Sequence, residues 1–340
     1  MKKHLKHYLI LLVPIICAFS MKVNGVLTFT ALFTFTIAVP LLELFTTPYL
    51  IGFDRKKALK EKRKFSYNIL LILGCSTHYL LLFYFFNNIS ETTFLSIEYF
   101  GKISSMGLCC GILGINIGHE MGHRNHKFYQ LLGEMSLLTS LYCHYLPYHN
   151  EVHHYLFATD KDPGTARKNE SVYTFWLRTQ LSYIKLSIAS EINQMKRLEK
   201  AKFSLSNRMV IYTIYYLLAL SFIWIKFGYS TLIAFVISAV FGILFTETFN
   251  YVSHYGLQRE TVNNIPERAT VKHSWNANYP ISLLLLLSRP RHSDHHKNSS
   301  KSYHLLLSLE NSRTLPTGFL GMMMCALIPP LWRRIMHKRL

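Results

Sequence analysis

Histidines in four short motifs are the residues of this sequence whose types and spacing can do chemistry. GHEMGH holds His119 and His123; HNEVHH holds His149, His153 and His154; NYVSHYG holds His254; RHSDHH holds His292, His295 and His296. On a helix, residues three or four positions apart share a face, so each multi-histidine motif can direct two imidazoles at one metal ion. An adjacent third histidine lies about 100° away around the helix and can serve a second ion.

Nine imidazoles exceed the needs of one metal ion. A tetrahedral zinc takes four ligands, so the number indicates two ions. A single H-x-x-x-H pair is more often an ordinary hydrogen-bonded pair. Three such motifs favour coordination, because nine crowded histidines would repel one another if protonated. Imidazole suits zinc, copper, iron and nickel, so the ligand type alone does not identify the metal. The six cysteines contain no C-x-x-C pair, which gives no indication of a thiolate site.

Long apolar segments must position these motifs. Half of the residues are apolar, only 16% are charged, and the formal net charge is +19. This composition is untypical of a soluble nucleic-acid binder, and we expect no nucleic-acid partner. A bilayer core of about 30 Å needs roughly 20 apolar residues per helix. We predict spans near 5–21, 25–51, 67–86, 103–118, 208–226 and 229–249.

The charges of the loops indicate the orientation of these spans. The N-terminus and the segment 54–64 (DRKKALKEKRK) are strongly basic, whereas 87–102 and 226–230 carry few cations. The positive-inside rule therefore places the N-terminus and the histidine motifs in the cytoplasm. We expect an all-α integral membrane protein with one domain over 1–340. Six transmembrane helices carry a cytoplasmic helical cap, formed by 119–207 and 250–340, that holds a histidine-rich dimetal site.

The segment 171–202 has two interpretations of equal weight. It mixes aromatic, aliphatic and basic residues, as a helix lying along the membrane surface does. A solvated helix packed on neighbouring cytoplasmic segments fits the same composition.

At the four histidine motifs the sequence resembles the membrane-bound alkane hydroxylase (alkane 1-monooxygenase) family of the fatty acid desaturase superfamily. Further matching segments are ATDKDPGTAR at 158–167, HSWNAN at 273–278 and PTGFLGMMM near the C-terminus. Histidine motifs alone are common to the superfamily, whereas NYVSHYG and HSWN are typical of the hydroxylase branch. The similarity extends over roughly residues 40 to 336.

The resemblance implies a di-iron site with all nine histidines as ligands. It also implies O₂-dependent hydroxylation of the terminal C–H bond of medium-chain alkanes or related alkyl chains to primary alcohols. Electrons come from rubredoxin and its reductase. The chain has no rubredoxin-like cysteine sites, so the electron donor is expected to be a separate protein. The implied location is a lipid bilayer, the inner membrane if the cell is bacterial, with a hydrophobic alkyl substrate reaching the irons between the spans.

Residues around the ligands are candidates for orienting them. At two positions where the family usually has glutamate, this chain has Tyr148 and Ser253. Carboxylates beside ligating histidines tune metal sites, so other acidic and polar groups are expected to take this role. The candidates are Glu120, Tyr148, Asp162, Glu247, Asn250, Ser253, His273 and Asp294.

Two alternatives remain open from the sequence. The first is a desaturase or hydroxylase of the same superfamily that acts on an acyl lipid or a ring-methyl group. The second is a catalytically silent membrane protein that binds metal, which the missing glutamates at 148 and 253 would suit.

Overall fold

The computed structural model describes residues 6–50, 65–263 and 265–340 and is predominantly helical. The expected basic loop at 54–64 and the first and last residues of two expected spans, 5 and 51, lie outside the described residues. The α-helices are α2 (Leu12–Lys22), α3 (Thr30–Phe33), α4 (Val39–Leu44), α6 (Ser66–Ser90), α7 (Ile97–Cys109), α8 (Asn116–Gly122), α9 (Lys127–Leu138), α10 (Tyr145–Tyr148), α11 (His154–Leu156), α12 (Val172–Arg197), α13 (Arg208–His254), α14 (Pro280–Leu285), α15 (His292–Lys297), α16 (Phe319–Ala326) and α17 (Pro329–Met336).

Shorter elements join or interrupt these helices. Strand β1 pairs antiparallel with β2, and β3 pairs parallel with β4. The 3₁₀ helices are η1 (His7–Leu11), η2 (Gly25–Phe29), η6 (Val271–His273) and η7 (Tyr303–Leu305). The π-helical turns are η3 (Thr34–Ala38), η4 (Cys110–Ile115) and η5 (His149–His153). The strands are β1 (Thr261–Val262), β2 (Ile265–Pro266), β3 (Trp275–Asn276) and β4 (Arg313–Thr314).

Four helices in the described part of the chain are long and apolar enough to cross a membrane. They run over Gly25–Leu44, Ser66–Ser90, Ile97–Gly122 and Arg208–His254. The expected first span corresponds to a shorter apolar helix, His7–Lys22. The expected fifth and sixth spans form the two halves of α13.

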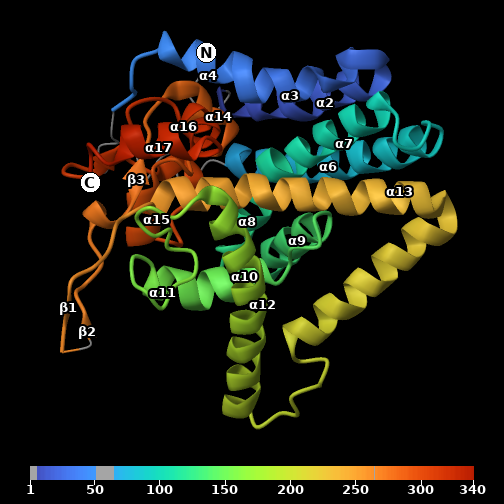
Figure 1. Cartoon of the computed structure of the whole chain (residues 1–340). Coiled ribbons are helices and arrows are strands. Elements are labelled where there is room, and N and C mark those ends of the chain that lie inside the picture. Colours follow the sequence, from blue (N-terminus) through green and yellow to red (C-terminus); the bar gives the residue numbers. More distant parts are fainter. Residues whose placement is uncertain (1–5, 51–64, 264) are drawn as a thin grey trace.

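Helix α13 bends sharply at its middle. Gly228 has a φ of 82° and a ψ of 175°, which is outside helical geometry, and the chain reverses there. Only glycine adopts this conformation without strain. Figure 1 shows that 208–227 runs obliquely away from the bundle, while 229–254 returns alongside α6 and α7.

Glycines allow α13 to approach α7 and η4 closely. A β-carbon at Gly242 would lie 2.6 Å from Cβ of Cys110 and 3.1 Å from the backbone nitrogen of Gly111. A β-carbon at Gly107 would lie 2.6 Å from Cβ of Phe241 on the facing helix. Small residues at such crossings let backbones pack tightly within apolar surroundings. This contact fixes the direction of α13 and therefore the position of its last turn, which carries His254.

The histidine-bearing segments gather at one end of the bundle. Figure 1 shows α8, α10, α11 and α15 beside the end of α13, with α12 lying across the bundle instead of along it. The adjoining core contains the buried side chains of Phe249, Trp275, Phe319 and Trp332. Apolar helices thus support a polar end in which the nine histidines meet.

The close crossing at Gly242 predicts a selective loss of stability on enlarging that residue. In Gly242→Ala, the methyl group must displace Cys110 or the backbone of η4, which we expect to cost about 1–3 kcal/mol. Thermal unfolding in detergent measures the effect. Val240→Ala, at an exposed position of the same helix, is the matched control and is expected to change little. Equal melting temperatures for the two variants would contradict this packing.

Candidate metal centre

All nine histidines of the four motifs come together in two groups. The first contains His119, His123, His149, His154 and His295, and the second contains His153, His254, His292 and His296. Within each group, one nitrogen of every ring lies within 4.8 Å of the others. Six of the nine are buried and the other three are partly buried. The structure therefore supplies one cluster of five imidazoles and one of four.

Two motifs place their histidines in the groups as α-helical geometry predicts. His119 and His123 are four residues apart at the end of α8 and enter the same group. On α15, His292 and His296 share a group, whereas the adjacent His295 points to the other.

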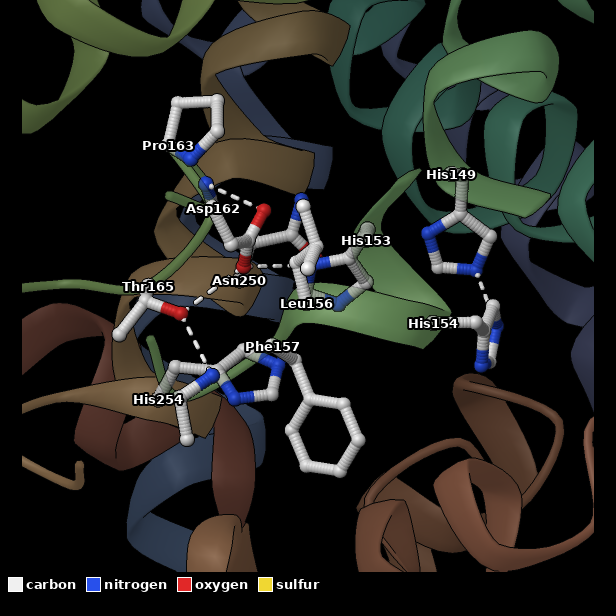
Figure 2. A network of polar contacts seen from close by, with 12 residues as sticks. His149, His153, His154, Leu156, Phe157, Asp162, Pro163, Thr165, Asn250 and His254 are labelled. Atoms are coloured by element: carbon white, nitrogen blue, oxygen red, sulfur yellow. Dashed lines mark hydrogen bonds and ion pairs between the residues drawn. The ribbon is translucent and has the colours of Figure 1, made fainter. Parts of the chain in front are cut away.

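The HNEVHH motif departs from that prediction. On an α-helix, His149 and His153 would share a face, but the structure groups His149 with His154 and sends His153 to the second group. The reason is the π-helical turn η5, whose hydrogen bonds join residues five apart instead of four. Figure 2 shows His149 and His154 facing each other, while His153 points toward His254.

The ring nitrogens converge at distances typical of ligands around one ion. In the second group, Nε2 of His292 lies 3.0 Å from Nε2 of His254 and 3.0 Å from Nε2 of His296, and the third side of this triangle is 3.2 Å. Two ligands at right angles, each about 2.0–2.1 Å from a metal, lie about 2.9 Å apart. The geometry of this triangle therefore fits a shared cation.

The first group forms a closed ring of contacts between Nε2 atoms. The distances are 2.8 Å for His119–His149, 3.0 Å for His149–His154, 3.3 Å for His154–His123 and 3.2 Å for His123–His119. Nε2 of His295 is buried with no hydrogen-bond partner among the described residues. Buried polar atoms normally have a partner, and a metal ion would satisfy this one.

Burial keeps the imidazoles in the neutral form that binds metals. Burial, followed by the charge of Arg289, lowers the pKa of His123 to about 3. Burial also lowers the pKa values of His149, His292 and His295 well below the ordinary 6.5. At neutral pH the rings therefore offer lone pairs instead of mutually repelling charges.

One carboxylate orients a histidine directly. Nδ1 of His153 lies 2.9 Å from Oδ2 of Asp162, as Figure 2 shows. Thr165 donates to the same oxygen at 2.8 Å, and the hydroxyl of Tyr148 donates to Oδ1 at 2.5 Å. Burial alone would raise the pKa of Asp162, but His153 and the hydrogen bond from Tyr148 outweigh it and lower the pKa to about 2. The ionised carboxylate fixes the His153 proton on Nδ1, leaving Nε2 directed at the second group.

Tyr148 stands at a position where the family that the sequence resembles usually has glutamate, and here its hydroxyl binds Asp162. Its ring stacks on Tyr183 at 3.7 Å between centroids, and its hydroxyl also accepts from the backbone of Gly164. Ser253 has a local role, donating to the carbonyl of Phe249 one turn earlier.

The other expected orienting residues form contacts farther from the ring nitrogens. Glu120 pairs with Arg124 at 2.7 Å, and Asp294 pairs with Lys301 at 2.5 Å. His273 accepts from the backbone of Thr270 and lies 3.2 Å from Glu267. These residues hold the segments that carry histidines.

Glu247 and Asn250 belong to a buried hydrogen-bond network. Its other members, Tyr142, Tyr183 and Arg289, were not predicted from the sequence. Tyr142 and Tyr183 donate to the carboxylate of Glu247 at 2.9 and 3.0 Å, and Asn250 donates to it at 2.9 Å. Arg289 then donates to Oδ1 of Asn250 at 3.0 Å.

Arg289 is a buried cation beside the imidazoles. Its guanidinium also contacts the hydroxyl of Tyr145 at 3.2 Å and lies 4.2 Å from the ring centroid of Phe249. The ring of Tyr145 stacks on His149 at 4.8 Å. The sequence signal for Arg289 was a charge two residues after the apolar run 281–287 and three residues before His292.

Comparisons with known proteins relate this site to a family. The fatty acid desaturase family model matches residues 99–323, which include all nine histidines. Alkane 1-monooxygenase 1 and alkane 1-monooxygenase 2 of Alcanivorax borkumensis are 34% and 35% identical over 80% and 70% of this chain. Alkane 1-monooxygenase of Acinetobacter baylyi is 34% identical over 69%. The chain spans 68%, 63% and 58% of the lengths of these relatives.

The contact between Asp162 and His153 predicts a loss of metal affinity when the carboxylate is neutralised. Asp162→Asn keeps the shape but removes the charge that orients the ring, so we expect affinity at the second group to fall about 10–100-fold. Competition with a chelator at equilibrium measures it. Asp160→Asn, an exposed neighbour in the same segment, is the control. Unchanged affinity in Asp162→Asn would refute the orienting role.

Proposed function

This chain belongs to the alkane 1-monooxygenase family of the fatty acid desaturase superfamily and is an oxidoreductase, and we propose that it hydroxylates the terminal C–H bond of medium-chain alkanes or related alkyl chains. The observation that carries the proposal is the meeting of nine imidazoles, six buried and three partly buried, in clusters of five and four. The proposed product is a primary alcohol.

The proposed cofactor is a pair of iron ions. The first iron is held by the five-histidine cluster and the second by the four-histidine cluster, so that the ligands are His119, His123, His149, His153, His154, His254, His292, His295 and His296. Redox-active iron would supply activation of O₂, which zinc cannot, and imidazole suits iron. The chain's own residues hold the ligands, exclude water and direct the substrate.

Three residues have distinct proposed roles around the irons. Asp162 orients His153 and sets its tautomer, while Tyr148 holds Asp162 by donating to its other oxygen. Arg289 disfavours protonation of the surrounding rings because it places a buried positive charge among them.

An apolar recess supports the proposed class of substrate. It has a volume of about 280 Å³ and lies between the second half of α13, α7, α12, α16 and the helix Gly25–Leu44. Its walls include Phe245, Trp176 and Met323. One helical turn beyond Phe245, the ring of Phe249 stacks on Phe319 at 4.2 Å and meets His292 edge-on at 5.6 Å. An alkyl chain in the recess would therefore have one aromatic layer between its end and the second histidine group.

Rubredoxin, reduced by its reductase, is the proposed electron donor. A second recess adjoins His296 and has Arg268 and Lys297 among its walls. Positive charge beside a ligand suits docking of an acidic carrier close to the metal, because complementary charges steer association.

The proposed topology has six passes, with the N-terminus and the cap (119–207 and 250–340) in the cytoplasm. At about 1.5 Å per residue, the 47 residues of α13 would extend about 70 Å if straight, more than twice the bilayer core. The reversal at Gly228 suits two passes instead. A basic N-terminus supports the orientation, and the inner membrane is the proposed location in a bacterial cell.

Metal content and oxidation products test the proposal together. Purified protein should bind two irons per chain and, with rubredoxin, its reductase and an alkane, form a primary alcohol. His149→Ala removes a donor of the five-histidine cluster and His254→Ala one of the four, so each is expected to lower iron content and abolish alcohol formation.

The exposed His126, which belongs to neither group, provides the control variant His126→Ala and should retain both properties. Bound iron with an alkene or a hydroxylated lipid as the product would instead favour the acyl-lipid alternative. Iron without any product from alkyl substrates would favour a silent metal-binding protein.

The size of the recess predicts the preferred chain length. Leu244→Phe fills part of it and should shift turnover toward shorter alkanes, whereas Trp176→Ala enlarges it and should favour longer ones. Each methylene contributes about 0.8 kcal/mol of burial, so preferences between neighbouring chain lengths should change about fourfold. Competition between alkanes of different length measures this. Leu217→Phe, exposed on the other half of α13, is the control. Identical product ratios in all three variants would exclude the recess as the substrate path.

A further inference from the structure

Glu43 is a buried acidic side chain in one of the helices that are long and apolar enough to cross a membrane. It is the only acidic residue between 25 and 44, and its exposed fraction is 0%. A buried carboxylate is costly unless hydrogen-bond donors surround it. Ionisable residues within membrane spans are rare and by default mark a function. Glu43 belongs to neither histidine group, so a role other than metal binding must account for it.

Glu43 binds one residue of α14, Ser282, with both of its carboxylate oxygens. The backbone nitrogen of Ser282 donates to Oε1 at 2.6 Å, and the hydroxyl of Ser282 donates to Oε2 at 2.5 Å. Ser282 is the third residue of α14, so its backbone N–H has no partner within that helix. The carboxylate therefore caps the N-terminus of α14 from a position 239 residues away in the sequence.

The hydroxyl of Ser282 extends this contact to α16. Because the hydroxyl gives its proton to Glu43, its lone pairs can accept, and the backbone nitrogen of Leu320 donates to it at 3.3 Å. Leu320 is the second residue of α16, so its N–H also lacks a partner within its helix. A β-carbon at Gly318 would overlap Oε2 of Glu43, so this close approach requires glycine. The carboxylate thus lies where α14 and α16 begin, and negative charge suits both helix ends.

Both helices lead toward the second histidine group, and Figure 1 shows them close to α4. The first residue of α16 is Phe319, whose ring stacks on Phe249 at 4.2 Å, and Phe249 meets His292 edge-on at 5.6 Å. One turn after Phe319, Met323 lines the apolar recess. Helix α14 is followed by Arg289, whose guanidinium lies 4.2 Å from the ring centroid of Phe249. The segments that α14 and α16 carry therefore meet at Phe249.

We propose that Glu43 is a positioning residue for the substrate. By capping α14 and α16, it fixes Phe319 against Phe249, and this aromatic layer closes the inner end of the recess beside His292. A fixed layer holds the end of an alkyl chain in one place, which favours reaction at the terminal carbon. Glu43 is not part of the wall of the recess and acts through the two helices. The inference rests on the proposed function, because it takes an alkyl chain as the occupant of the recess.

Two substitutions break this arrangement at different points. Glu43→Gln keeps the shape of the side chain but replaces one acceptor oxygen with a donor, so it cannot accept both hydrogen bonds from Ser282. Ser282→Ala leaves Glu43 in place and removes the link to Leu320. The matched control is Glu98→Gln, because Oε1 of Glu98 accepts from the backbone nitrogen of Gly25 at 3.0 Å, a comparable contact at the start of η2.

Binding of a bromoalkane reports on the recess without metal or turnover. Bromine quenches the fluorescence of a nearby indole, and Trp176 lies in the wall of the recess. The background is the full-length chain with Trp224→Phe, since Trp224 is exposed and lies outside the recess. We expect the affinity for 1-bromododecane to fall about fourfold in Glu43→Gln and Ser282→Ala, which corresponds to the loss of one packed methylene group. Glu98→Gln should retain the affinity.

The ratio of terminal to subterminal alcohol measures positioning in the active protein. It should fall several-fold in Glu43→Gln and Ser282→Ala and stay unchanged in Glu98→Gln. A purely structural role of Glu43 would lower stability without moving this ratio. Affinity and ratio that are unchanged in both variants, or changed equally in Glu98→Gln, would overturn the inference. A lower affinity with an unchanged ratio would overturn it as well.

Failure of the proposed function would be distinguishable from failure of this inference. If the unsubstituted protein forms no alcohol, the proposed function fails, and the bromoalkane affinity of Glu43→Gln relative to Glu98→Gln still decides the inference. If one of the two substitutions prevents folding, the other provides the same comparison.

Discussion

The structure depends on one constraint, which is that nine imidazoles are held close together, with the ring nitrogens of each group within 4.8 Å of one another and several of them about 3 Å apart. Protonated rings would repel at this distance, and neutral rings direct lone pairs at one another. A metal ion at the centre of each group would be bound by several of these lone pairs at once. The arrangement itself therefore suits metal binding, independently of any relative.

The fold meets this constraint by bringing rigid helix ends to one place. The close crossing of α7, η4 and α13 at their glycines sets the positions of His119 and His254. The π-turn η5 places His149 and His154 in the first group and directs His153 to the second. Around these first contacts lie a carboxylate that orients His153, several tyrosines and a buried arginine, which form further hydrogen bonds. Apolar helices that support the site also line the recess proposed to hold the substrate.

Much of this site could be predicted from spacing, because histidine motifs at helical intervals leave few geometric choices. The separation of His295 from His296 is one example. The pairing of His149 with His154 does not follow from α-helical spacing, since it depends on a π-turn, which has no clear sequence signature. The contact of Tyr148 with Asp162 joins residues 14 positions apart through a loop, which periodicity does not describe. The apolar segments were found from composition, but their exact lengths were not, as the shorter His7–Lys22 illustrates.

We propose that the two histidine clusters hold two different iron ions. Mössbauer spectroscopy of protein loaded with ⁵⁷Fe tests it most directly, because each iron environment gives its own quadrupole doublet. The five-donor and four-donor clusters predict two doublets of equal area, both lost when the histidines of both groups are replaced. A single doublet from one iron per chain, or spectra unaffected by those replacements, would contradict the account.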